Sequence, residues 1–404
     1  MTIKALYPTV RPTLNLDFAK TKALDPRVTF TRASTGTFVG ATGLIQTAAS
    51  GAARFDHNPT TGESLGLLVE EARTNLLLQS SALTTASWGL TNVTRTANST
   101  TAPDGTNTAV KIASTTGTWQ TFLSQVSVAG ITAVPTTFSC YAKAAEASWF
   151  CLAGIQYGEA IAFFNLATGA LGTRSAGSAH SITPVGNGWY RCSVTCASAA
   201  STQWGFFPGS ADNTLTPAAI GNGVHVWGPQ LEAGAFPTSY IPTTTATVTR
   251  AADVASMTGT NFSSWYRQDE GTLYAKALNK ITNYIASIND SSPLNQSLTI
   301  YQPNSSQTAL FSRTSSGVQA QIIVTGATNA FNKFAGCYKT NDFAVSVNSG
   351  TVGTDTSGAI PISTTFDIGA QRLGVAYGMS GIIARLTYYP VRLPDAQLQA
   401  LTAT

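Results

Sequence analysis

Short segments in which every second residue is apolar recur along most of the chain, and turn residues separate them. Between residues 79 and 247, roughly eight such segments follow one another at spacings of ~8–12 residues, and no segment shows a helical period. They cover 109–112, 119–122, 137–143, 149–152, 161–164, 189–196, 203–206 and 224–227, with turns at 103–105, 167–169 and 186–188. In a strand with a period of two, alternate side chains point to the same face. The pattern therefore predicts an antiparallel β-sandwich or jelly roll over 79–247.

A second module is predicted over residues 248–404. Strand-like segments lie at 271–277, 343–347, 365–369 and 381–389, and Asn348-Ser-Gly350 has the composition of a turn. Pro394 and Asp395 mark the start of a short helix near the end of the chain. A Thr-rich segment over 241–249 precedes this module, and its β-branched residues favour an extended, semi-stiff linker.

Residues 1–78 differ from both modules because Pro8, Pro12 and Pro26 interrupt short apolar runs at 14–18, 28–30 and 43–45. Such a segment has too few strands for a large core of its own, so we expect it to pack on the next domain or to dock on a partner. The predicted fold class is all-β, with an N-terminal docking segment followed by two antiparallel β-sandwiches.

The charge content limits the classes of partner. Only 10% of residues are charged, against ~25% in an average soluble protein, while 43% are hydrophobic. Disorder is excluded by that hydrophobic content. The 23 Lys and Arg residues form no basic run, so we expect no nucleic-acid partner. No apolar stretch approaches the ~20 residues of a membrane span, and the first residues lack the apolar region of a signal peptide.

Five cysteines at irregular spacing do not form a disulfide framework. In a strand, Tyr190, Cys192, Val194 and Cys196 share one face, so we expect free, buried thiols. Three scattered histidines give no zinc site. The candidate calcium ligands are Asp342, Asp355 and Asp367. Their spacing is not diagnostic of a calcium site, so we leave calcium binding as an open prediction.

The acids do not predict an enzyme. A glycosidase needs two carboxyl groups about 5–10 Å apart. Asp269 and Glu270 are adjacent, as are Glu70 and Glu71, so within a strand each pair points to opposite faces. We expect solvated or turn-capping acids at these positions. Asp56 and His57 lie in a Pro/Gly-rich stretch that is typical of a turn. We therefore predict a protein without catalytic activity.

Three phrases of the sequence carry a resemblance: residues 25–36, 66–78 and 226–242. They are similar to structural proteins of tailed bacteriophages. The resemblance implies a fibre, spike or decoration subunit that projects from the head or tail, made in the host bacterial cytoplasm and located on the virion surface. It further implies docking through residues 1–78 to a capsid or tail protein, and a homotrimer.

Both modules resemble carbohydrate-recognition folds. Residues 75–77, Trp88, 187–191 and 229–232 resemble the jelly rolls of carbohydrate-binding modules, and 248–404 resembles concanavalin-like and laminin-G-like sandwiches. This implies host-glycan binding as an alternative or added role, with aromatic rings stacking on sugars. The candidate rings are Trp119, Trp149, Tyr157 and Trp204, although large aromatics in sandwiches are more often core residues. A dedicated receptor-binding tail fibre and a polysaccharide depolymerase remain alternatives.

Overall fold

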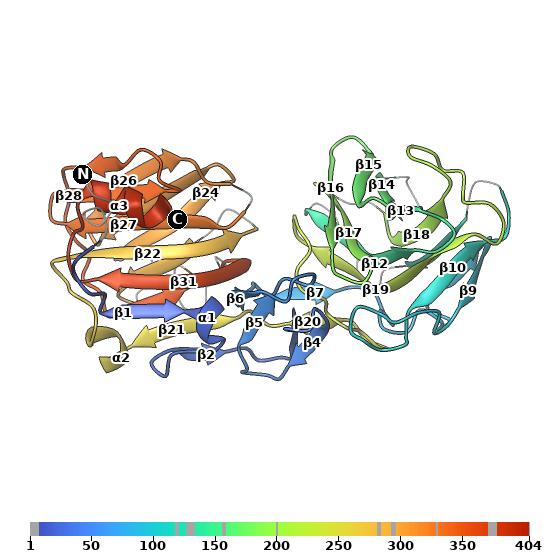
Figure 1. Ribbon diagram of the computed structural model, residues 1–404, viewed down its shortest axis with the longest axis horizontal. Coiled ribbons are helices and arrows are strands. Elements are labelled where there is room, and N and C mark those ends of the chain that lie inside the picture. Colours follow the sequence, from blue (N-terminus) through green and yellow to red (C-terminus); the bar gives the residue numbers. More distant parts are fainter. Residues whose placement is uncertain are drawn as a thin grey trace.

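The computed structural model describes residues 8–117, 121–126, 134–155, 159–198, 201–280, 284–291, 296–328, 330–370 and 378–403. Two β-sandwiches lie side by side, and N-terminal strands run along the C-terminal sandwich and into the region between the two (Figure 1). The predicted all-β class is confirmed, because antiparallel sheets account for nearly all of the regular structure.

The jelly-roll sandwich occupies the middle of the chain and consists of two six-stranded sheets. One has the order β16-β17-β12-β19-β10-β9 and the other the order β15-β14-β13-β18-β11-β8. The strands are β8 (Gly89–Thr91), β9 (Val93–Thr96), β10 (Val110–Ser114), β11 (Phe122–Val126), β12 (Thr136–Ala144), β13 (Trp149–Gly154), β14 (Glu159–Asn165), β15 (Ala170–Arg174), β16 (Ser178–Pro184), β17 (Trp189–Cys196), β18 (Gln203–Gly209) and β19 (Gly223–Ala233).

Alternate residues of these strands fill the space between the two sheets. Phe138 and Trp204 meet edge to face with ring centroids 5.6 Å apart, and Phe150 packs against Phe206 at 5.8 Å. Cys140 lies directly opposite Cys192 across the β12–β17 ladder. The prediction of free, buried thiols is confirmed for all five cysteines. Burial raises the pKa of Cys140 and Cys192, so both stay protonated and unreactive at neutral pH.

The C-terminal sandwich has an eight-stranded sheet, β29-β28-β27-β22-β31-β6-β5 with β1 also on β31, and a seven-stranded sheet, β2-β21-β30-β23-β24-β25-β26. Its strands are β1 (Leu14–Asp17), β2 (Thr29–Thr31), β5 (Arg54–His57), β6 (Ser64–Val69), β21 (Val254–Thr258), β22 (Glu270–Asn279), β23 (Tyr284–Asn289), β24 (Ser297–Asn304), β25 (Gln307–Thr314), β26 (Gly317–Thr325), β27 (Asn332–Lys339), β28 (Asp342–Val347), β29 (Gly353–Asp355), β30 (Thr365–Ile368) and β31 (Gly381–Tyr389).

The N-terminal segment is part of this sandwich, which corrects the prediction of a separate docking segment over 1–78. β1 pairs with Arg385–Tyr388 of β31, β6 pairs with Gly381–Ile383 of the same strand, and β2 pairs with β21. Leu14, Leu16 and Phe18 belong to the core between the two large sheets. Without these strands, one side of β31 would keep its backbone groups unpaired, so the segment completes a sheet.

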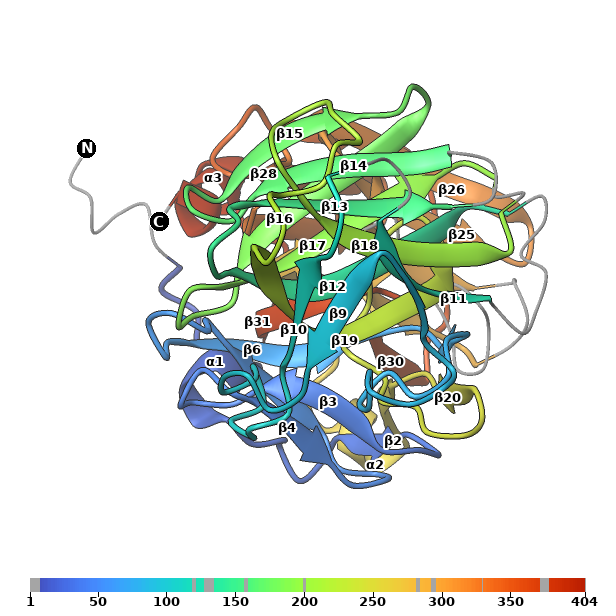
Figure 2. The same cartoon turned by 90° about the vertical axis from the view of Figure 1, so that its right-hand side faces the viewer.

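Short elements connect the sandwiches and cover their outer faces. The hairpin of β3 (Gly36–Val39) and β4 (Ile45–Ala48) and the ribbon of β7 (Arg73–Asn75) with β20 (Val248–Arg250) lie between them (Figure 1). Figure 2 shows the hairpin below the jelly-roll sheets in the end-on view. Thr243 in the predicted linker donates to Leu77 O at 2.6 Å, which fixes that segment. The helices are α1 (Phe18–Thr21), α2 (Thr260–Ser263) and α3 (Asp395–Ala403).

Helix α3 confirms the predicted C-terminal helix, and its Leu398 packs on the outer side of β27 and β28 beside Cys337 and Ala344. In the described part of the chain, no helix combines the length and apolarity needed to cross a membrane.

Candidate functional site: a pocket at the junction of the two sandwiches

Five charged side chains form a buried cluster at the junction of the sandwiches, and we call them the junction cluster. They are Arg32, Arg54, Glu70, Arg250 and Asp253, and their side chains are at most 2% exposed. Arg54 lies at the centre, with Nη1 2.9 Å from Glu70 Oε2 and Nη2 2.5 Å from Asp253 Oδ2. Arg32 Nη1 binds Asp253 Oδ1 at 3.0 Å, and Arg250 Nε lies 3.4 Å from Glu70 Oε2.

Glu70 connects this cluster to the exit of the jelly roll. The backbone N of Ser239 donates to Glu70 Oε1 at 2.8 Å, and Ser239 Oγ donates to Oε2 at 2.6 Å. Burial opposes ionisation of Glu70, but the charges of Arg250 and Arg54 outweigh it and hold the pKa of Glu70 well below its usual range. The carboxylate therefore stays charged and joins segments that are 169 residues apart. The prediction that Glu70 is a solvated or turn-capping acid is wrong.

The three phrases that carry the phage-like resemblance converge on this junction. Arg32 comes from residues 25–36, Glu70 from 66–78 and Ser239 from 226–242. Asn75 adds a further link, since its Nδ2 donates to Ile241 O at 2.9 Å and its Oδ1 accepts from the N of Leu231 at 3.1 Å. The phrases therefore encode how the two sandwiches are joined.

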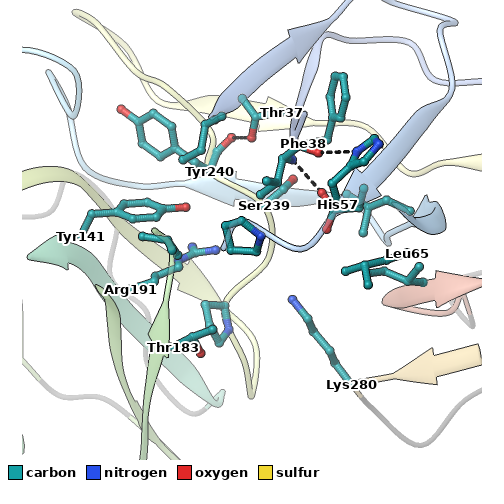
Figure 3. A pocket seen from close by; sticks show the side chains of 18 of the residues that line it. Thr37, Phe38, His57, Leu65, Tyr141, Thr183, Arg191, Ser239, Tyr240 and Lys280 are labelled. Carbon is teal, nitrogen blue, oxygen red and sulfur yellow. Dashed lines mark hydrogen bonds between the residues drawn. The ribbon is translucent and has the colours of Figure 1, made fainter. Parts of the chain in front are cut away.

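A cavity of about 250 Å³ lies against this cluster, between the two sandwiches, and we call it the junction pocket (Figure 3). One wall is the outer face of β12, β16 and β17, the opposite wall belongs to β5, β6 and the end of β22, and the hairpin β3–β4 and residues 237–240 close it. Its volume is below the ~300–1,000 Å³ of typical drug-sized sites, so it suits a small ligand.

Charged groups face the junction pocket from both walls. Asp56 lies on β5, where its Oδ1 accepts from the backbone N of Val39 at 2.6 Å. Burial raises the pKa of Asp56 to about 6, although the bond from Val39 and the charge of Lys280 oppose this. Lys280 follows β22 and its ammonium points into the cavity (Figure 3). Arg191 of β17 approaches from the jelly-roll side (Figure 3).

Neutral polar groups and apolar surface complete the pocket. Ser181 and Thr183 of β16 are exposed at the jelly-roll wall, where Ser181 and Ser193 hydroxyls lie 2.7 Å apart. Leu65, Ile382 and Pro237 supply apolar surface. Hydrogen-bond donors and acceptors can bind the hydroxyls of a sugar ring, and the apolar patch between them can bind its C–H face.

His57 also lines the pocket and is 6% exposed. Its Nδ1 lies 3.1 Å from Val39 O, so Nδ1–H donates to this carbonyl. Asp56 and His57 therefore belong to a buried strand, and the predicted turn at these residues is wrong. The sequence carries no local signal for this placement, because Asp56 and His57 end a four-residue strand that the turn residues Asn58 and Pro59 follow directly.

Two acids line the described part of this pocket, and they differ in their partners. Both oxygens of Glu70 accept bonds from Ser239, and Arg54 and Arg250 neutralise its charge. Asp56 is not held in an ion pair with a described residue.

Of the four aromatic residues predicted to stack on sugars, the structure describes Trp149 and Trp204. Trp204 is fully buried in the jelly-roll core, so we no longer propose it as a stacking residue. Trp149 is half-buried on the outer face of β13, next to Phe163 and Phe207, and stays a prediction. Trp119 and Tyr157 lie outside the described residues.

Of the candidate calcium ligands, Asp342 and Asp355 lie on the paired strands β28 and β29, whereas Asp367 lies in the other sheet. Asp342 on β28 pairs with Arg392 at 2.8 Å, Asp355 on β29 caps a turn through Ser357, and Asp367 lies in the other sheet and accepts from Asn289. Over the described ranges, no three His, Cys, Asp or Glu side chains form a metal-binding group. Calcium binding stays an untested prediction.

Comparisons with known proteins give no family for this chain: no family model matches, and no curated protein matches. Among solved structures, the CBM40 domain of a Ruminococcus gnavus IT-sialidase bound to α2,3-sialyllactose is 18% identical, over 34% of this chain and 84% of that chain, with a TM-score of 0.31.

Two further similarities are of the same strength. The NanB sialidase of Streptococcus pneumoniae is 16% identical over 36% of this chain and 26% of that chain, with a TM-score of 0.32. A heptameric SAP-like pentraxin from Limulus polyphemus is 18% identical over 32% and 68%, with a TM-score of 0.26. At these TM-scores we base neither a family nor a ligand on them.

Proposed function

We propose that this chain is a structural protein of a tailed-phage virion, a fibre, spike or decoration subunit, and that its junction pocket binds one sugar unit of a host-surface glycan. The observation that carries the glycan part is the pocket itself, whose walls come from both sandwiches and present donors, acceptors and apolar surface together. The virion part rests on the three phage-like phrases. In this proposal the protein binds the sugar without cleaving it.

The junction cluster supports a rigid projection. The ion-paired Glu70 binds Ser239 at the exit of the jelly roll, and β7 pairs with β20 where the chain enters and leaves that sandwich, which leaves little freedom between the two sandwiches. A rigid subunit suits a protein that must hold a binding site away from a capsid or tail. Docking to a capsid or tail protein, a homotrimer and a position on the virion surface belong to the same proposal.

A glycan array with the purified chain tests the binding role. Thr183→Trp places a bulky ring at the mouth of the pocket from the edge strand β16, whereas Thr94→Trp is the matched control on β9, the opposite edge strand of the same sheet. We expect Thr183→Trp to abolish binding and Thr94→Trp to retain it. Folded wild-type protein that binds no glycan would contradict the binding role and leave the structural one.

Mass spectrometry and cryo-electron microscopy of purified phage particles test the virion role. We expect the chain to be present in particles as a projecting density on the head or tail. Particles that lack it would contradict the structural proposal, whatever the array shows.

A further inference from the structure

We infer that the sugar unit bound in the junction pocket carries a carboxylate, and that Lys280 and Arg191 recognise this group. This inference rests on the proposed glycan binding and specifies the class of sugar. It starts from the charges that line the pocket and from which of them are already paired.

Four charged residues line the junction pocket in the described part of the chain: Asp56, Glu70, Arg191 and Lys280. Glu70 is neutralised, because Arg54 and Arg250 both lie against it. The remaining three groups are two cations and one acid, so the pocket presents a net positive charge to a ligand. A partly enclosed site strengthens that charge relative to open solvent.

Lys280 is the more available cation. Its side chain is exposed, its backbone N is fixed by Ser380 O at 2.9 Å, and it makes no ion pair with another described residue. Asp56 lies on the same wall and its pKa is lowered by the charge of Lys280, but no ion pair joins the two side chains in the described part of the chain. A flexible ammonium group with three donors can reach an anionic group of a ligand in the cavity.

Arg191 provides a fixed positive charge on the other wall. Its Nη2 donates to Ser139 Oγ at 3.1 Å, its Nη1 donates to Thr238 O, and the guanidinium lies over the Tyr141 ring at 5.4 Å. Its Nε is buried and has no hydrogen-bond partner among the described residues. A buried donor without a partner is costly, and a ligand oxygen at this place would remove that cost.

Asp56 then determines how the sugar lies. Its Oδ1 is held by Val39, and its carboxylate repels an anionic group but accepts bonds from hydroxyls. A sugar carboxylate therefore lies toward Lys280 and Arg191, while hydroxyls lie toward Asp56 and Ser181. Charge-assisted bonds to a carboxylate are roughly twice as strong as neutral ones, so the acidic group contributes most of the selectivity.

Isothermal titration calorimetry of the full chain with glucuronate, glucose and acetate tests this inference. We expect glucuronate to bind about tenfold more tightly than glucose, a factor that corresponds to one charge-assisted contact. Lys280→Gln should remove this preference. Lys339→Gln, which removes an exposed charge at the end of β27, is the matched control and should keep the preference.

The outcomes separate this inference from the proposed function. Equal binding of glucose and glucuronate, or a preference that survives Lys280→Gln, overturns the inference and leaves glycan binding intact. Acetate that binds as tightly as glucuronate makes the pocket an anion site and overturns it too. Absence of binding by both sugars contradicts the proposed glycan binding itself.

Discussion

At the scale of single residues, charged partners give two neighbouring buried acids opposite properties. Glu70 and Asp56 both line the junction pocket, yet the pKa of Glu70 is held low by two arginines, whereas burial raises the pKa of Asp56 to about 6. The difference comes from the partners and not from the residue type. Glu70 therefore stabilises the junction as a permanent charge, and Asp56 is an acid whose charge costs stability.

Asp56→Asn should stabilise the protein at alkaline pH. The folded pKa of Asp56, about 6, lies above its ordinary value of 3.8, so the folded protein binds the proton more tightly than the unfolded chain does. Stability from this group is therefore full below pH ~4 and is lost as pH rises through about 6. Asn keeps an acceptor for Val39 N and carries no charge. We expect a gain of about 2 kcal/mol at pH 8 and no gain at pH 4, measured by chemical denaturation.

Glu63→Gln is the control for this experiment, because it removes one negative charge from the turn between β5 and β6 at an exposed position. It should leave the stability at both pH values nearly unchanged. An Asp56→Asn protein with the wild-type pH profile would show that Asp56 has an ordinary pKa.

At the scale of elements, β31 joins the two ends of the chain. Its first residues pair with β6 and its last with β1, so a strand near residue 385 is flanked by strands from the first 70 residues. Gly66 allows this approach, since its φ is +125° and an added Cβ would lie 2.3 Å from Ile383 O. The β6–β31 pairing therefore depends on a glycine at this position.

Gly66→Ala should separate β6 from β31 and destabilise the C-terminal sandwich by about 3 kcal/mol, because both the φ angle and the contact with the Ile383 carbonyl oppose a methyl group. Gly117→Ala is the control, since its added methyl group would have no neighbouring atom within 4 Å. Thermal unfolding of both variants measures the difference. A Gly66→Ala protein as stable as Gly117→Ala would mean that β6 can shift without loss.

At the scale of the whole molecule, the junction cluster makes the two sandwiches one unit. Its five charged residues come from four segments of the chain, and Glu70 binds Ser239 at the exit of the jelly roll. Removal of one charge from a cluster of buried ion pairs leaves the remaining buried charges without a compensating charge. The coupling of the sandwiches therefore depends on a few buried charged residues, in a chain that has few charged residues elsewhere.

Glu70→Gln should destabilise the protein by about 3–5 kcal/mol and separate its unfolding into two transitions, whereas we expect one transition for the wild type. Differential scanning calorimetry measures both effects. Asp269→Asn is the control, because it breaks the exposed ion pair with Arg267 and should leave a single, unchanged transition. If Glu70→Gln also unfolds in one unchanged transition, the cluster does not couple the sandwiches.

Local patterns in the sequence are enough to predict the all-β class, the C-terminal helix, the buried thiols and the jelly-roll strands other than β8, β9, β15 and β16. These features depend on alternation between neighbours and on start signals such as Pro394-Asp395. Strands β23 to β27 are not predicted by such patterns, because Ser, Thr and Asn, which are typical of loops, occupy many of their positions. The burial of Trp204 escapes it too, because residue type alone does not reveal which aromatic ring lies in the core.

The tertiary structure is needed to see that residues 14–69 complete the C-terminal sandwich and that Asp56, Arg191 and Lys280 face one cavity. The residues paired between β1 and β31 are about 370 positions apart, and no local period specifies such a partner. Local alternation determines which face of a strand is buried. Which strands meet, and which charges they bring together, depends on the packing of the whole chain.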